Sequence, residues 1–194
     1  MRLIQLQSLL FLTGCIVAAE GGLMLLPALA DIDAHQKTWS VFATSALVTS
    51  FVGMSVALAM RGSRIDLNAR QTFLLTSMIW VSATIFGALP FFLWRPEAGI
   101  ANAVFETASG LTTTGSTVLT GLDQLPRGIL LWRALLQCFG GVGIVVLAAA
   151  LLPVLRVGGM QLFKSESSDR SQKVFAHMRH IAISIIIVYF TLVA

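Results

Sequence analysis

The chain has 194 residues, of which 56% are apolar and only 11% are charged. Soluble domains carry roughly a quarter charged residues, so this composition excludes an ordinary soluble protein and indicates an integral membrane protein. The net charge is +4, and because no aromatic side chains alternate with the basic ones, no nucleic-acid partner is expected.

Four apolar segments are long enough to cross a bilayer as helices, for which roughly 20 residues are needed. They comprise residues 3–29, 38–60, 71–94 and 134–155. Residues 12–15 (LTGC) resemble a lipoprotein cleavage box, and residues 28–30 (ALA) resemble an ordinary signal-peptidase site. The apolar run continues well past Cys15, which favours an uncleaved first span. Cys15 and Cys138 lie in different spans, and we expect both to be unpaired small apolar side chains.

The charged residues between the spans predict the orientation of the chain. Residues 61–70 contain three arginines and residues 156–180 contain five basic residues, whereas residues 30–37 contain two aspartates and one lysine. Basic loops remain on the cytoplasmic side of a membrane. We therefore expect a multi-pass protein with a cytoplasmic N-terminus, in which residues 95–127 leave and rejoin the outer face.

A short apolar helix is predicted between the third and fourth spans, at residues 100–111 (IANAVFETASGL). Its three- and four-residue spacing predicts one apolar face, made of Ala101, Val104, Phe105, Ala108 and Leu111. A stretch of this length suits a re-entrant helix better than a span. The sequence TTTGST that follows disfavours continuing the helix. The predicted order is span, half-helix, polar extended segment, span.

Non-helical backbone at membrane depth is tolerated only where it is buried in protein or lines a water-filled path. Carbonyls of an extended segment can replace the water shell of a monovalent cation. Gly115 can supply a positive φ, the threonine hydroxyls can add ligands or brace the segment, and the negative end of the half-helix dipole favours a cation there. The predicted ion-binding residues are Thr112, Thr113, Thr114 and Gly115, with Ser116 and Glu106 as possible support. Glu106 could add negative charge near the outer mouth or anchor the half-helix by hydrogen bonding.

Three stretches carry a specific resemblance: residues 105–126 (FETASGLTTTGSTVLTGLDQLP), 130–155 (LLWRALLQCFGGVGIVVLAAALLPVL) and 158–166 (GGMQLFKSE). Together they resemble the TrkH family of bacterial potassium-uptake proteins, within the superfamily of Trk, Ktr and HKT transporters. Four helix–pore-loop–helix repeats make the pore in that superfamily. The resemblance places a K+ selectivity filter on Thr112–Gly115, with Gly115 at the glycine kept from the potassium-channel signature. Ser116 stands where many relatives have alanine.

The resemblance implies an all-α membrane protein with a defined organisation. Residues 1–66 form an N-terminal pair of transmembrane helices, and residues 67–160 form the first helix–pore-loop–helix repeat. Residues 161–180 form a cytoplasmic loop, and residues 181–194 begin the first helix of a second repeat. Because one pore loop is present where four are needed, the chain is expected to be an N-terminal fragment that does not transport alone.

The resemblance also implies the partners and the location. A full-length relative is expected to transport potassium, by a channel-like route or by symport, in the bacterial inner membrane. It is expected to form a homodimer surrounded by lipid and to bind a cytoplasmic, TrkA-like nucleotide-binding regulatory subunit. The transported potassium ion is the one small species expected, without an organic cofactor.

Several alternatives remain open. The chain has no Walker loop, H-E-x-x-H or G-x-S-x-G motif, so no enzyme is predicted. A non-transporting membrane scaffold or assembly protein, or a sodium-permeable relative, would also fit the sequence. We expect Arg133 to snorkel toward the interface and Glu20 to have a structural partner or an interfacial position. His177 and His180 could hold a metal if helical, although an ordinary cytoplasmic loop is favoured.

Overall fold

The computed structural model describes residues 3–62 and 69–155 together with Ser184 and Thr191. Every regular element among these residues is helical, as the sequence predicts. The chain divides into two compact units, Met1–Gln137 and Cys138–Ala194. The elements run in the order α1 (Leu3–Leu23), α2 (Leu25–Asp33), α3 (Trp39–Ala59), α4 (Ala69–Gly87), α5 (Leu89–Trp94), η1 (Pro96–Ala98), α6 (Ile100–Leu111), η2 (Leu122–Gln124) and α7 (Arg127–Leu155).

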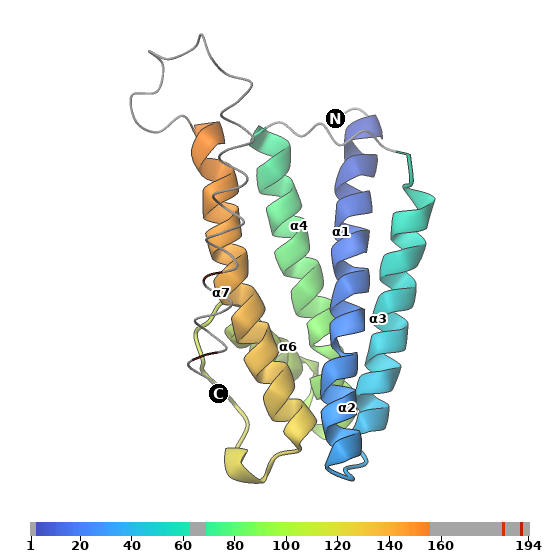
Figure 1. The fold of residues 1–194 in the computed structure, drawn as a ribbon, viewed down its shortest axis with the longest axis vertical. Helices are drawn as coiled ribbons and strands as arrows, with labels where there is room; N and C mark the ends of the chain where they lie inside the picture. Colours follow the sequence, from blue (N-terminus) through green and yellow to red (C-terminus); the bar gives the residue numbers. More distant parts are fainter. Residues whose placement is uncertain (1–2, 63–68, 156–183, 185–190, 192–194) are drawn as a thin grey trace. The chain divides into compact units, whose positions relative to one another are not determined.

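The first two spans form an antiparallel hairpin (Figure 1), in which α2 continues α1 beyond a break at Met24. Small residues let α1 and α3 approach closely. A Cβ placed on Gly14 would lie 2.9 Å from the carbonyl oxygen of Gly53, and one on Gly53 would lie 2.8 Å from the Cα of Ala18. Glycine at these two positions therefore sets the separation of the two helices.

The third span is interrupted near its end. The apolar stretch Arg70–Trp94 is long enough to cross a membrane, but α4 ends at Gly87 and α5 begins at Leu89. Pro90 lies in the first turn of α5, where a missing backbone N–H costs nothing. The break leaves the carbonyl of Gly87 to accept a 3.0 Å hydrogen bond from the indole N–H of Trp132.

Three helical stretches among the described residues are long and apolar enough to span a membrane, namely Leu6–Asp33, Trp39–Ala59 and Arg70–Trp94. The fourth predicted span falls within α7, which has 29 residues and begins at Arg127 rather than at Ala134. The apolar core of the first unit includes Phe42, Ile129 and Trp132, whose exposed fraction is 0%. This core joins the N-terminal hairpin to the start of α7.

The predicted loops differ in how much of them the structure describes. The two aspartates assigned to a loop after the first span, Asp31 and Asp33, belong instead to α2, and Asp31 is fully buried. The predicted cytoplasmic loop and the helix at 181–194 lie outside the described residues, except that Ser184 and Thr191 are helical. His177 and His180 also lie outside them. Both cysteines are free, as predicted.

Candidate functional site

The predicted half-helix is present as α6, which runs from Ile100 to Leu111. The apolar face predicted for this helix is only partly buried, with Leu111 inside the protein. The side chains of Ala101 and Phe105 are exposed, whereas Glu106 and Thr107 are buried. An apolar face does not mark the inside of a helix in a membrane, where lipid accepts apolar groups and polar groups need partners within the protein.

The backbone amides of the segment after α6 turn back onto the end of that helix. The N–H of Thr113 donates to Gly110 at 2.9 Å, and the N–H groups of Thr114 and Gly115 both donate to the carbonyl of Ser109, at 3.0 and 3.4 Å. Among the described residues, none donates a hydrogen bond to the carbonyls of Thr112–Gly115. The segment therefore keeps its acceptors available.

The sign of φ alternates along this segment. Thr112 has φ −80°, Thr113 has +56° and Gly115 has +76°, and Thr114 is not among the residues with positive φ. Such changes in the sign of φ let successive N–H groups point to one side, and the N–H groups of Thr114 and Gly115 do share the carbonyl of Ser109. The positive φ predicted at Gly115 is confirmed. Thr113 was not predicted, because a β-branched residue rarely adopts this conformation.

Hydroxyl groups fix the segment from within. The Thr112 hydroxyl donates to the carbonyl of Ala108 at 2.8 Å and lies 2.8 Å from the hydroxyl of Thr114. The Ser109 hydroxyl donates to the carbonyl of Ser116 at 2.6 Å. Two of the three consecutive threonines thus use their hydroxyls as braces, and the carbonyl of Ser116 is held by α6.

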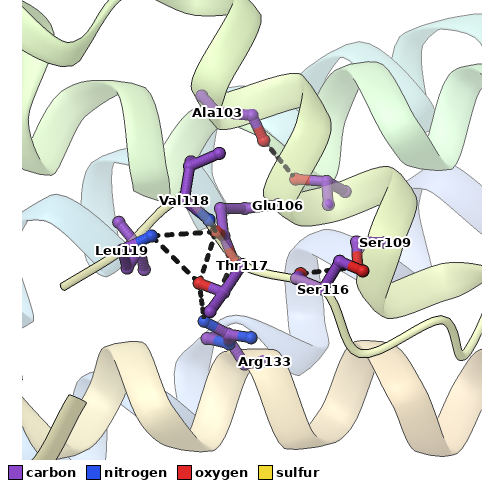
Figure 2. Close-up of polar contacts among 9 residues, drawn as sticks. Ala103, Glu106, Ser109, Ser116, Thr117, Val118, Leu119 and Arg133 are labelled. Atoms are coloured by element: carbon purple, nitrogen blue, oxygen red, sulfur yellow. Dashed lines mark hydrogen bonds and ion pairs between the residues drawn. The ribbon is translucent and has the colours of Figure 1, made fainter.

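Glu106 holds the next part of the segment (Figure 2). Its Oε1 accepts hydrogen bonds from the Thr117 hydroxyl at 2.6 Å and from the N–H groups of Val118 and Leu119 at 2.6 and 3.3 Å. Its Oε2 lies 3.0 Å from Nη1 of Arg133, which also donates to the Thr117 hydroxyl at 2.6 Å. Of the two roles considered for Glu106, the structure supports anchoring.

The ion pair explains how the buried carboxylate of Glu106 is tolerated inside the protein. Glu106 is 2% exposed, and a buried charge is costly unless it is paired and hydrogen-bonded. Arg133 provides the opposite charge, so the prediction that it snorkels was wrong. The sequence did contain a signal for this ion pair. One acidic and one basic residue lie in otherwise apolar surroundings, on the two helices that flank the same segment.

Two further acidic residues lie inside the first unit. Glu20 is 8% exposed, and its carboxyl oxygens have no hydrogen-bond partner among the described residues. The structural partner considered for Glu20 is not found among the described residues, and its interfacial position stays a prediction. Asp31, which sequence reasoning treated only as a loop charge, accepts a hydrogen bond from the first turn of α7.

Comparisons with known proteins agree with this architecture. The family model of TrkH, described as a cation transport protein, matches residues 38–194. The Trk system potassium uptake protein TrkI of Halomonas elongata is 46% identical over 132 residues, covering 67% of this chain and 27% of that protein. The potassium uptake protein TrkH of Salmonella typhimurium is 42% identical over 156 residues, covering 80% of this chain and 32% of that protein.

A solved structure is also similar. The crystal structure of the potassium transporter TrkH from Vibrio parahaemolyticus has a TM-score of 0.79 and 34% sequence identity, and covers 96% of this chain and 37% of that one. The chain spans well under half the length of these relatives. A family match over most of its residues shows that the chain belongs to the TrkH family of cation transport proteins.

Proposed function

We propose that this chain contributes one of the four pore loops of a potassium transporter, in which the backbone carbonyls of Thr112–Gly115 coordinate dehydrated K+. The observation that carries this proposal is the backbone of the segment, whose φ alternates in sign between Thr112 and Gly115 while its carbonyls remain free of hydrogen bonds from described residues. Relatives named as potassium uptake proteins support the choice of ion.

The coordination follows from the chemistry of the ion. A K+ ion that leaves water needs oxygen ligands of suitable number and field strength, and backbone carbonyls supply them in potassium-selective filters. The negative end of the α6 dipole, at Gly110 and Leu111, favours a cation beside the segment. One loop approaches the ion from one side, so three further loops complete the pore. We call the protein in which these loops come together, on one polypeptide or several, the assembled transporter.

The same proposal includes the location and partners of the assembled transporter. It lies in the bacterial inner membrane with a cytoplasmic N-terminus, so the filter opens toward the outer face. It forms a homodimer and binds a TrkA-like regulatory subunit on the cytoplasmic side, where the basic residues 156–180 lie. Chemical crosslinks from Lys164 or Lys173 to that subunit are expected, and labelling of both lysines only from outside would contradict this orientation.

The test substitutes Gly115 with serine in the assembled transporter. A side chain at a positive φ costs about 1 kcal/mol or more and displaces the adjacent carbonyls, so the preference for potassium over sodium should fall. Uptake of rubidium competed with sodium measures this preference. Gly121→Ser is the matched control, because Gly121 also has a positive φ and open space where a Cβ would lie.

The outcomes separate the alternatives left open by the sequence. A filter loses its ion preference in Gly115→Ser and keeps it in Gly121→Ser. A scaffold or assembly protein loses only stability, to a similar extent in both variants. A sodium-permeable relative shows no preference for potassium before any substitution. An unchanged preference in Gly115→Ser would place the filter elsewhere.

A further inference from the structure

Asp31 is a buried acidic residue at the C-terminal end of α2, outside the candidate filter. It is 0% exposed, and both of its carboxylate oxygens have partners. Oδ2 accepts a 2.5 Å hydrogen bond from the hydroxyl of Thr38. Oδ1 accepts a 2.5 Å hydrogen bond from the backbone N–H of Gly128, 97 residues away in the sequence. The carboxylate thus links the N-terminal hairpin to the first turn of α7.

A second hydrogen bond also joins the N-terminal hairpin to the start of α7. The side-chain oxygen of Gln36 accepts a 2.9 Å hydrogen bond from the backbone N–H of Arg127. The first N–H groups of a helix have no partner within the helix, and they carry the positive end of its dipole. The two residues immediately before α7 are Leu125 and Pro126, whose side chains cannot accept a hydrogen bond. The hairpin therefore supplies the cap that the local sequence lacks.

The contact at Gly128 is close enough to require glycine. A Cβ on Gly128 would overlap the carboxylate of Asp31 and would lie 2.8 Å from the ring of Phe42. Because Asp31 and Phe42 are both fully buried, neither can move aside easily. This junction sets the position of the start of α7 against α2 and α3.

The first turns of α7 also carry the residue that braces the candidate filter. Arg133 lies five positions after Gly128 and binds the Thr117 hydroxyl and Glu106. Leu136, three positions further, packs against the end of α6, where a Cβ on Gly110 would lie 2.9 Å from the Cβ of Leu136. A displacement at the start of α7 would therefore be transmitted to both contacts.

We propose that Asp31 is a positioning residue for ion selectivity: by capping α7, it holds Arg133 in place against Thr117 and Glu106. The hairpin that precedes the pore-loop repeat is then part of the support of the filter and not only a membrane anchor. This inference rests on the proposed function, because it assumes that the Thr112–Gly115 segment coordinates the ion.

The experiment measures rubidium uptake competed with sodium in the assembled transporter. Asp31→Ala should lower the preference for potassium over sodium, because the uncapped start of α7 no longer holds Arg133 against Thr117 and Glu106. Asp33→Ala is the matched control, because Asp33 lies on the same helix end but is exposed, and it should leave the preference unchanged. The ratio of the two ions does not depend on the amount of folded protein.

A second variant tests the proposal even if Asp31→Ala does not fold. Gln36→Ala removes the neighbouring acceptor at a partly exposed position and should lower the preference in the same direction by a smaller factor. If both variants fold and leave the preference unchanged, while Gly115→Ser lowers it, Asp31 has no positioning role and the filter assignment stands. If Gly115→Ser also leaves it unchanged, the proposed function itself fails.

A double-mutant cycle tests whether Asp31 acts through Arg133. Arg133→Lys shortens the side chain that contacts Thr117 and Glu106, and this substitution alone should lower the preference for potassium over sodium. Adding Asp31→Ala to Arg133→Lys should then lower the preference little further, because the contact that Asp31 positions is already impaired. Independent, multiplying effects of the two substitutions would overturn the proposed route.

Discussion

Glu106 on α6 and Arg133 on α7 form an ion pair, with Oε2 and Nη1 3.0 Å apart and side-chain exposures of 1% and 13%. The same carboxylate accepts hydrogen bonds from Thr117, Val118 and Leu119. One buried side chain therefore connects the half-helix, the segment that leaves the candidate filter and the following transmembrane helix.

Glu106→Gln should destabilise the protein and weaken its ion preference. The amide oxygen of glutamine can still accept the hydrogen bonds from Thr117 and Val118, but Arg133 would remain charged and largely buried without its partner. Breaking a pair in this way costs about 2 kcal/mol or more. The midpoint of heat unfolding in detergent measures the effect. Glu97→Gln, which changes an exposed glutamate, is the control and should have no effect on the midpoint.

The double variant Glu106→Gln with Arg133→Gln tests the origin of that loss. It leaves neither member of the pair as an unpartnered buried charge, so its free energy of unfolding should fall by less than the sum of the two single losses. A simple sum would mean that the two side chains contribute separately and that the ion pair is not the cause of the destabilisation.

Gly87→Ala should destabilise the first unit. A Cβ at this position would lie 2.8 Å from Cγ2 of Thr107 and 2.9 Å from Oε1 of Glu20, so the buried side chains of Thr107 and Glu20 must shift to make room for it. Overpacking of this kind costs about 1–3 kcal/mol. Gly22→Ala is the control, since nothing lies within 4 Å of its added Cβ, and it should stabilise α1 by about 0.5–1 kcal/mol through helix propensity. Equal unfolding midpoints for the two variants would contradict this packing.

The sequence predicted the elements better than their contacts. Residues 100–111 were assigned to a short helix because an apolar pattern precedes a run of threonine and glycine, and α6 has these limits. Long apolar runs likewise predicted α3 within one residue at each end. These features are local, since they depend on hydropathy and on residues that disfavour a helix.

The contacts of charged residues could not be predicted in this way. Asp31 and Arg133 each bind a residue far from them in sequence, and hydropathy carries no information about such pairing. In a membrane, the apolar face of a helix can meet lipid as well as protein, so the pattern of α6 did not reveal that Glu106 is turned inward. The positive φ of Thr113 is imposed by its surroundings and opposes its local preference.

Glu20→Gln should behave differently from Glu106→Gln. Glu20 has no hydrogen-bond partner among the described residues, so a neutral side chain of the same shape removes a potential buried charge without breaking a known contact. The free energy of unfolding should stay the same or rise. A loss of more than about 1 kcal/mol, measured beside Glu106→Gln in the same detergent, would show that the carboxylate of Glu20 has a partner in the membrane.

The 194-residue chain should not transport potassium by itself. It carries one TTTG segment, which under the proposed function would supply carbonyls from one side of an ion, whereas a potassium filter surrounds the ion with carbonyls from four segments. The missing ligands leave most of the dehydration cost of K+ without compensation. Liposomes that contain the purified chain should take up rubidium no faster than empty liposomes, with the full-length TrkH of Vibrio parahaemolyticus as a positive control. Uptake above background that is abolished by Gly115→Ser and kept by Gly121→Ser would show instead that several copies of the chain assemble a working filter.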